Sequence, residues 1–111
     1  MRPVKMIVNK KYDLYLLKTQ NFFERLFGLM FFRKLTNLFL PGVKIVHSFF
    51  VFHSFLVIYL KRKNPITFTV LDTGVLRPFR IGKFVKGCTD VVETEIQWNS
   101  IVTVGDEVVI K

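Results

Sequence analysis

Two histidines and one cysteine are the first candidates for chemistry in this 111-residue sequence, because imidazole and thiolate groups act as bases, nucleophiles and metal ligands. His47 and His53 would lie on the same face of one uninterrupted strand, ~20 Å apart, which is too far to share a metal ion. Neither a third histidine nor a pair of cysteines completes a ligand set, so we expect no metal site. Cys88 has no CxxC partner and is expected to be an ordinary buried thiol.

A second candidate is Asp72-Thr73-Gly74, which follows the apolar residues Val70 and Leu71. The triplet is similar to the Asp-Thr-Gly of retroviral-type aspartic proteases, in which two aspartates share a proton. Too few residues follow Gly74 for the flap and the second half of such a protease, so we interpret the triplet as a plain turn after a strand. Nucleophile elbows, phosphate-binding glycine loops and zinc helices are absent from the sequence, and we expect no cofactor.

The charge balance favours anionic partners. Seventeen Lys and Arg against eight Asp and Glu give a net charge of +9, which attracts anionic small molecules, nucleic acid and anionic membrane surfaces alike. The basic residues form short, separate clusters, as on a solvated surface. The apolar stretch from Val46 to Leu60 would reach only ~22 Å as a helix, so we expect no transmembrane span. A single cysteine and the lack of an apolar signal segment predict a cytoplasmic protein.

The elements that must position these residues are mostly strands. Half of the residues are apolar and thirteen are Phe, a composition that favours strands in one small domain spanning residues 1–111. The fold class we predict is mainly β (α+β): a compact barrel-like or sandwich-like domain with one short helix near residues 20–27, after an N-cap at Thr19. The expected strands are Val4–Val8, Leu14–Leu17, Val43–Phe52, Phe55–Leu60, Ile66–Leu71, Val91–Ile96 and Thr103–Ile110, the last interrupted at Gly105-Asp106. Residues 29–40 are left unassigned.

Several ordered motifs resemble the domain-of-unknown-function 192 family. They are Glu24-Arg25-Leu26-Phe27-Gly28-Leu29-Met30-Phe31, His47-Ser48-Phe49-Phe50, Arg77-Pro78-Phe79-Arg80, Val91-Val92-Glu93 and Val104-Gly105-Asp106-Glu107-Val108-Val109-Ile110. The resemblance implies a compact β-rich domain with a short helix, and it implies no established activity. The chain departs from the family pattern at Phe32, where members usually carry an arginine, with Arg33 following.

The motifs are polar or glycine positions in an otherwise apolar chain, which predicts a groove where residues 28–33, the strand at His47 and the loop at residues 77–80 converge. We predict a non-enzymatic, cytoplasmic binding or accessory module for an anionic ligand, bound by Arg33, His47, Arg77 and Arg80. One alternative is a small enzyme that uses His47 as a general base with Asp72 or Glu93 nearby. The other is an electrostatic binder of nucleic acid or of an anionic membrane surface.

Overall fold

Seven strands and one 3-10 helix make up the part of the chain that the computed structural model describes, residues 1–21, 37–48 and 51–111. The elements are β1 (Arg2–Val8), β2 (Tyr12–Lys18), β3 (Leu38–Pro41), β4 (Phe55–Arg62), β5 (Thr67–Leu76), β6 (Asp90–Thr94), η2 (Ile96–Ser100) and β7 (Glu107–Ile110). No helix in these ranges is long and apolar enough to cross a membrane.

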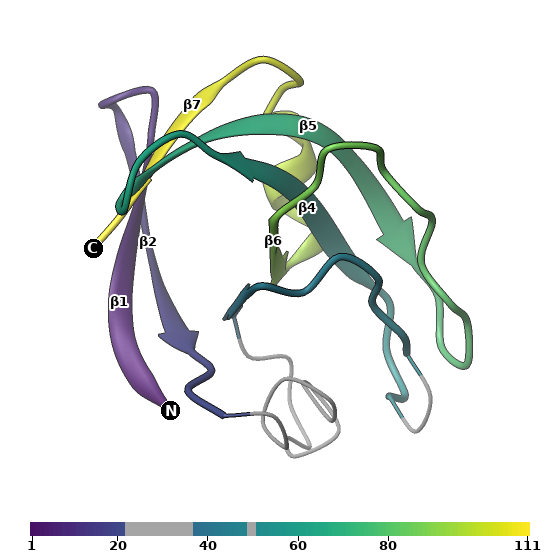
Figure 1. Ribbon diagram of the computed structural model, residues 1–111. Helices are drawn as coiled ribbons and strands as arrows, with labels where there is room; N and C mark the ends of the chain where they lie inside the picture. Colours follow the sequence, from purple (N-terminus) through teal and green to yellow (C-terminus); the bar gives the residue numbers. More distant parts are fainter. Residues whose placement is uncertain (22–36, 49–50) are drawn as a thin grey trace.

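The strands close into a barrel in the order β1-β2-β3-β6-β4-β5-β7, and pairing of β7 with β1 completes the circle (Figure 1). The β2–β3 pair is parallel, whereas the other pairs are antiparallel. The first hairpin turns at Asn9 and Lys10, whose φ angles of 51° and 59° are those that a tight hairpin turn requires. The predicted mainly β class is therefore confirmed, and the sheet is a closed barrel rather than a sandwich.

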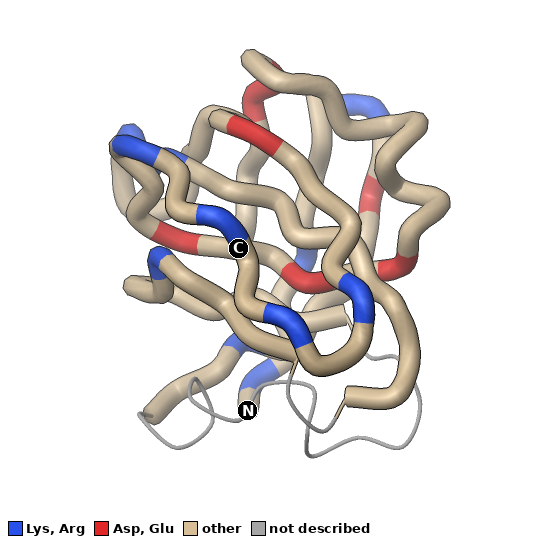
Figure 2. The backbone as a smooth tube through the Cα atoms, turned by 90° about the vertical axis from the view of Figure 1, so that its right-hand side faces the viewer, with Lys and Arg blue, Asp and Glu red and all other residues tan. Residues whose placement is uncertain are grey.

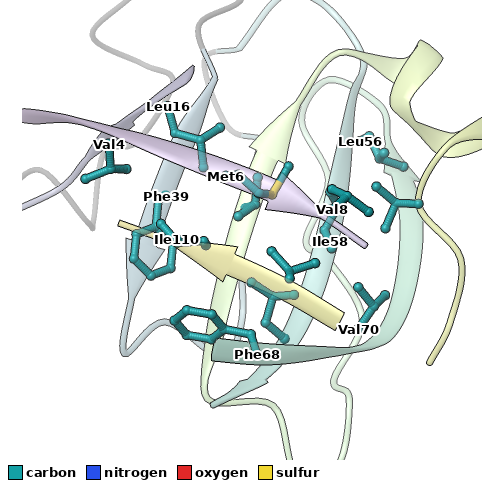
Figure 3. Packing of buried hydrophobic residues seen from close by; sticks show 14 residues of the cluster. Val4, Met6, Val8, Leu16, Phe39, Leu56, Ile58, Phe68, Val70 and Ile110 are labelled. Atoms are coloured by element: carbon teal, nitrogen blue, oxygen red, sulfur yellow. The ribbon is translucent and has the colours of Figure 1, made fainter. Parts of the chain in front are cut away.

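Successive side chains of β4 point to opposite faces of the sheet and belong to two different hydrophobic clusters. Leu56, Ile58 and Leu60 point into the barrel and join the cluster that Figure 3 shows, packed with residues such as Met6 and Val70. The intervening residues of β4 face outward but are equally buried, in a second cluster: Phe55, Val57 and Tyr59. This outer cluster is covered by the segments between β3 and β4 and between β5 and β6, which contribute Val46, Val51 and Cys88.

Several expected elements differ from the structure. The predicted strand Val43–Phe52 is wrong, because its described residues form only an isolated bridge between His47 and Ile81. The segment instead runs over the outside of the barrel and buries Val46, Ser48 and Val51 there. The last strand begins only at Glu107, and residues 38–41, left unassigned from the sequence, form β3. Residues 22–36 lie outside the described residues, and with them most of the predicted helix.

The predicted turn at Asp72-Thr73-Gly74 is also wrong, since the triplet continues β5. A bulge at this point shifts the register, so that Tyr59 pairs with Asp72 and Leu60 pairs with Val70. The backbone partners that β4 supplies make the strand more favourable here than the turn that the side chains alone would allow.

Candidate functional site

The centre of the candidate site is Ser48, a fully buried serine that holds the turn at residues 77–80, which we call the arginine turn. Its backbone N–H donates to the Arg80 carbonyl at 2.8 Å, and its carbonyl accepts from the Phe79 N–H at 2.9 Å. The Ser48 hydroxyl accepts from the Arg80 N–H at 2.6 Å and lies within hydrogen-bond distance of the carbonyl oxygens of Arg77 and Arg80. Every polar group of Ser48 is therefore used to fix this turn.

The same contacts place three of the four predicted binding residues together. His47 precedes Ser48 and bridges to Ile81, while Arg77 and Arg80 are the ends of the arginine turn. Both arginines are exposed, and His47 is half-buried. The fourth residue, Arg33, lies outside the described residues. The sequence motifs thus predicted that the segment at His47 contacts the loop at residues 77–80. The regular strand that they predicted at His47 is only an isolated bridge to Ile81.

Within the described part of the chain, no acidic side chain forms an ion pair with Arg77 or Arg80. Phe79, between them, adopts a φ of 58°, a left-handed conformation that is uncommon for a bulky residue. Such strain persists only where surrounding contacts enforce it, and here the Ser48 carbonyl supplies the bond to the Phe79 N–H. The arginine turn is therefore a rigid support for two cationic side chains.

A pocket of about 250 Å³ lies beside this turn, over the outer face of β4 and β5. Gly74 of β5 belongs to its lining, and the Gly82 N–H donates to the carbonyl of Val46, in the segment between β3 and β4, at 2.8 Å. The pocket is lined by Tyr59, Gly74, Val75, Leu76, Ile81, Gly82 and Lys83.

Charged groups at this pocket are paired with each other. Lys83 Nζ lies 2.8 Å from Asp72 Oδ2 and 5.8 Å from the centroid of the Tyr59 ring. The hydrogen bond from Lys83, together with one from the Thr73 backbone, lowers the pKa of Asp72 against a smaller effect of burial. Burial raises the pKa of Tyr59, so its phenol is a neutral hydrogen-bonding group at neutral pH.

Glu93 is a buried acid on the outer face of β6, between Leu38 of β3 and Val57 of β4. Its exposed fraction is 2%, and no described residue donates a hydrogen bond to Oε1. Burial raises the pKa of Glu93 to about 8, so the carboxyl is mostly protonated at neutral pH. The sequence suggested this glutamate only as a partner of His47, whereas the structure buries all five residues of β6, Asp-Val-Val-Glu-Thr.

A second buried acid, Asp90, is fully satisfied by hydrogen bonds. It accepts from Arg62 Nη2 at 2.9 Å, from the Thr89 hydroxyl at 2.7 Å and from the Gly42 N–H at 3.0 Å. Burial alone would raise its pKa, but these hydrogen bonds outweigh it and lower the pKa of Asp90 below its ordinary value. Asp90 therefore stabilises the junction between β3, β4 and β6 rather than serving a ligand.

The contacts of the other candidate residues, Asp72 and Cys88, are those of structural rather than reactive groups. Asp72 pairs with Lys83 rather than acting as a free base, and the enzymatic role of His47 stays a prediction. Cys88 is buried and donates to the Asp90 carbonyl at 3.3 Å, and burial raises the pKa of its thiol, which disfavours the reactive thiolate. Across residues 1–21, 37–48 and 51–111, no three His, Cys, Asp or Glu side chains gather as a metal ion would require.

Comparison with known proteins supports the fold. No protein-family model matches the chain, and no curated protein matches it significantly in sequence. The structure is similar to that of a protein of unknown function from Novosphingobium aromaticivorans DSM 12444, with a TM-score of 0.67. The likeness covers 96% of this chain and 82% of the other, at 16% sequence identity. At that identity, what the two proteins share is the fold: a small, mainly β domain.

Proposed function

We propose that this protein is a non-enzymatic binding module for an anionic ligand, which it binds at the arginine turn beside His47. The observation that carries the proposal is the set of hydrogen bonds from Ser48 to residues 77–80. Because these bonds fix the backbone of the turn, both arginines are held close together without the entropic cost of ordering a loop on binding. Guanidinium groups suit the recognition of carboxylate and phosphate oxygens.

Charge supports the same conclusion. The net charge of +9 attracts anions to the surface, and the arginine turn has no described acidic partner that would neutralise it. Lys83 is a weaker candidate for the same role because Asp72 already occupies its ammonium group. The turn is therefore the better place for an incoming anion.

Titration with inorganic phosphate and pyrophosphate, followed by amide chemical shifts, tests this role. We expect shifts at residues 47–48, 77 and 79–81, and at least ~10-fold weaker binding in an Arg77→Gln/Arg80→Gln variant. The matched control is Lys61→Gln/Lys63→Gln, which removes the same charge from the exposed end of β4 and the turn that follows it, at the opposite end of the β4–β5 hairpin. Equal losses in the two variants would show that only net charge attracts the anion, and the proposed site would be wrong.

We also propose that the chain is a divergent member of the domain-of-unknown-function 192 family. Support comes from the order of its motifs, of which His47-Ser48 and Arg77-Pro78-Phe79-Arg80 contact each other directly. We further propose that Arg33 is a third cation of the same site and, from its single cysteine, that the protein is cytoplasmic. The variant Arg33→Gln, measured in the same phosphate titration, is expected to weaken binding as either arginine of the turn does.

A further inference from the structure

The surface around the arginine turn is apolar as well as cationic. Large hydrophobic side chains are exposed at the turn and along the loop that follows it: Phe52 by 79%, Phe79 by 44%, Ile81 by 64% and Phe84, further along the loop, by 70%. Within residues 77–86, Phe79, Ile81 and Phe84 alternate with the basic residues Arg77, Arg80, Lys83 and Lys86. We call residues 77–86 together with Phe52 the mixed edge.

Two separate segments build this edge. The ring centroids of Phe52 and Phe79 lie 5.6 Å apart in an edge-to-face arrangement, which joins the segment before β4 to the loop after β5. In Figure 1 the loop after β5 runs along one side of the barrel, at the right, and Figure 2 views the molecule from that side. Lys and Arg also occur elsewhere on the backbone in Figure 2, so it is the interleaving with exposed apolar residues that distinguishes the mixed edge.

Single exposed hydrophobic side chains are ordinary, but several in one neighbourhood mark a surface that binds something. The backbone beneath them is fixed, because Ser48 bonds to Arg80 and the Gly82 N–H bonds to the Val46 carbonyl. A rigid edge with alternating apolar and cationic groups matches a bilayer surface, where acyl chains lie directly beneath a layer of phosphate groups. The positive net charge of +9 gives the charge complementarity that an anionic leaflet requires.

The type of side chain favours lipid over nucleic acid. Single-stranded nucleic acid binds to aromatic faces on which successive bases stack, and two of the three phenylalanines, Phe52 and Phe79, are packed edge-to-face on each other. Ile81, exposed by 64%, offers no ring for stacking, but it can enter a hydrocarbon interface. Lys and Arg side chains beside it can extend their charged ends to the head groups while their stems stay apolar.

We propose that the mixed edge binds the surface of an anionic bilayer, with Phe52, Phe79 and Phe84 entering the interface and Arg77, Arg80 and Lys86 contacting lipid phosphates. The inference rests on the proposed anion-binding function and names its ligand, the anionic lipid head group. The protein lies on the membrane without crossing it.

Co-sedimentation with vesicles tests the inference, using phosphatidylcholine alone and phosphatidylcholine mixed with phosphatidylserine. We expect salt-sensitive binding to the mixed vesicles and at least ~10-fold weaker binding of a Phe52→Ser/Phe84→Ser variant. Tyr15→Ser is the matched control, because Tyr15 is 73% exposed on β2 and outside the mixed edge. The inorganic phosphate titration of the Phe52→Ser/Phe84→Ser variant should match that of the wild type.

Absence of wild-type binding to the mixed vesicles, or equal binding by the phenylalanine variant and Tyr15→Ser, would overturn the inference. So would a single-stranded oligonucleotide whose binding, rather than vesicle binding, weakens in the phenylalanine variant. Failure of the underlying function looks different: Arg77→Gln/Arg80→Gln would then leave phosphate binding unchanged while the phenylalanines still governed vesicle binding. In that outcome the attachment to lipid would be apolar, and the inference that the arginine turn contacts head groups would be wrong too.

Discussion

Ser48 and Arg80 are joined by a reciprocal pair of hydrogen bonds, from the Ser48 N–H to the Arg80 carbonyl at 2.8 Å and from the Arg80 N–H to the Ser48 hydroxyl at 2.6 Å. Replacement of Ser48 by Ala leaves the Arg80 N–H without its partner. We expect Ser48→Ala to lower the free energy of unfolding by about 1–3 kcal/mol. Phosphate binding should weaken as well, because the arginine turn loses its support.

Urea denaturation and the phosphate titration measure the two effects of Ser48→Ala. Ser54→Ala is the control, since Ser54 is half-buried in the same segment and holds no part of the arginine turn. A Ser48→Ala protein with wild-type stability and wild-type phosphate affinity would contradict this account of the site.

Substitution of Gly82 tests how tightly the loop after β5 packs against the barrel. A Cβ atom at this position would be 2.8 Å from Val46 Cγ2, closer than such atoms approach in proteins, and 3.0 Å from the Tyr59 hydroxyl, which is also a tight contact. We therefore expect Gly82→Ala to reduce the free energy of unfolding by about 1–3 kcal/mol. At Gly74 a Cβ would meet only the end of the flexible Lys83 side chain, at 3.6 Å, so Gly74→Ala should be nearly neutral. Thermal unfolding of the two variants gives the comparison, and equal melting temperatures would contradict it.

The raised pKa of Glu93 should lower the stability of the protein as the pH rises from about 4.5 to about 8. Its pKa is raised to about 8 in the folded protein, so the folded state holds a proton that the unfolded state releases above about pH 4.5. The contribution of Glu93 to stability is therefore greatest below that pH, declines by up to about 1.4 kcal/mol per pH unit, and is fully lost once the pH passes the folded pKa.

The uncharged variant Glu93→Gln should lack this decline. Its stability relative to the wild type is expected to increase from pH 5 to pH 9 in urea denaturation, whatever constant cost the buried amide adds. Other titrating groups cancel in that difference. A difference that is the same at every pH would mean that Glu93 is not protonated in the folded protein.

For Asp90 we expect the opposite pH dependence of the free energy of unfolding. Its pKa is lowered in the folded protein, so the stability that it contributes is present above its ordinary value of 3.8 and is lost as the pH falls through the lower folded value. At pH 7 we expect Arg62→Gln to cost about 1.5–3 kcal/mol, because the carboxylate loses its charged donor. The deficit should shrink toward pH 3 as Asp90 becomes protonated, whereas Lys61→Gln should have little effect at either pH. A deficit that is as large at pH 3 as at pH 7 would assign it to the packing of Arg62 on Phe68 instead.

The local sequence pattern predicted the strands correctly where their own side chains form the core of the barrel. The β1–β2 hairpin and β4 follow from their apolar runs and their turns, and both are present. Val43–Phe52 has the same composition as a strand, but its apolar residues pack onto the outside of the barrel, and that packing depends on contacts with residues far along the chain. Asp72-Thr73-Gly74 has the residues of a turn, and pairing with β4 nevertheless keeps it extended.

The candidate site could be predicted only in part for the same reason. The motifs containing His47 and Arg77–Arg80 suggested that these residues meet, and they do. The sequence did not predict Ser48 as a residue of the site, because a serine gives no local sign that its hydroxyl will hydrogen-bond to a turn 32 residues away. Glu93 was predicted as a partner of His47, whereas in the structure every residue of β6 is buried and the Glu93 carboxyl is mostly protonated at neutral pH.

The position of β4 between two cores separates two kinds of change that the protein can undergo. Leu56, Ile58 and Leu60 belong to the barrel, whereas Phe55, Val57 and Tyr59 support the layer that carries the arginine turn. A substitution at one of the second set can move or reshape that layer while the barrel stays closed. Substitutions at neighbouring positions of this strand should therefore have different effects. Those at Leu56, Ile58 and Leu60 should alter the stability of the barrel, and those at Phe55, Val57 and Tyr59 should alter the shape of the binding surface.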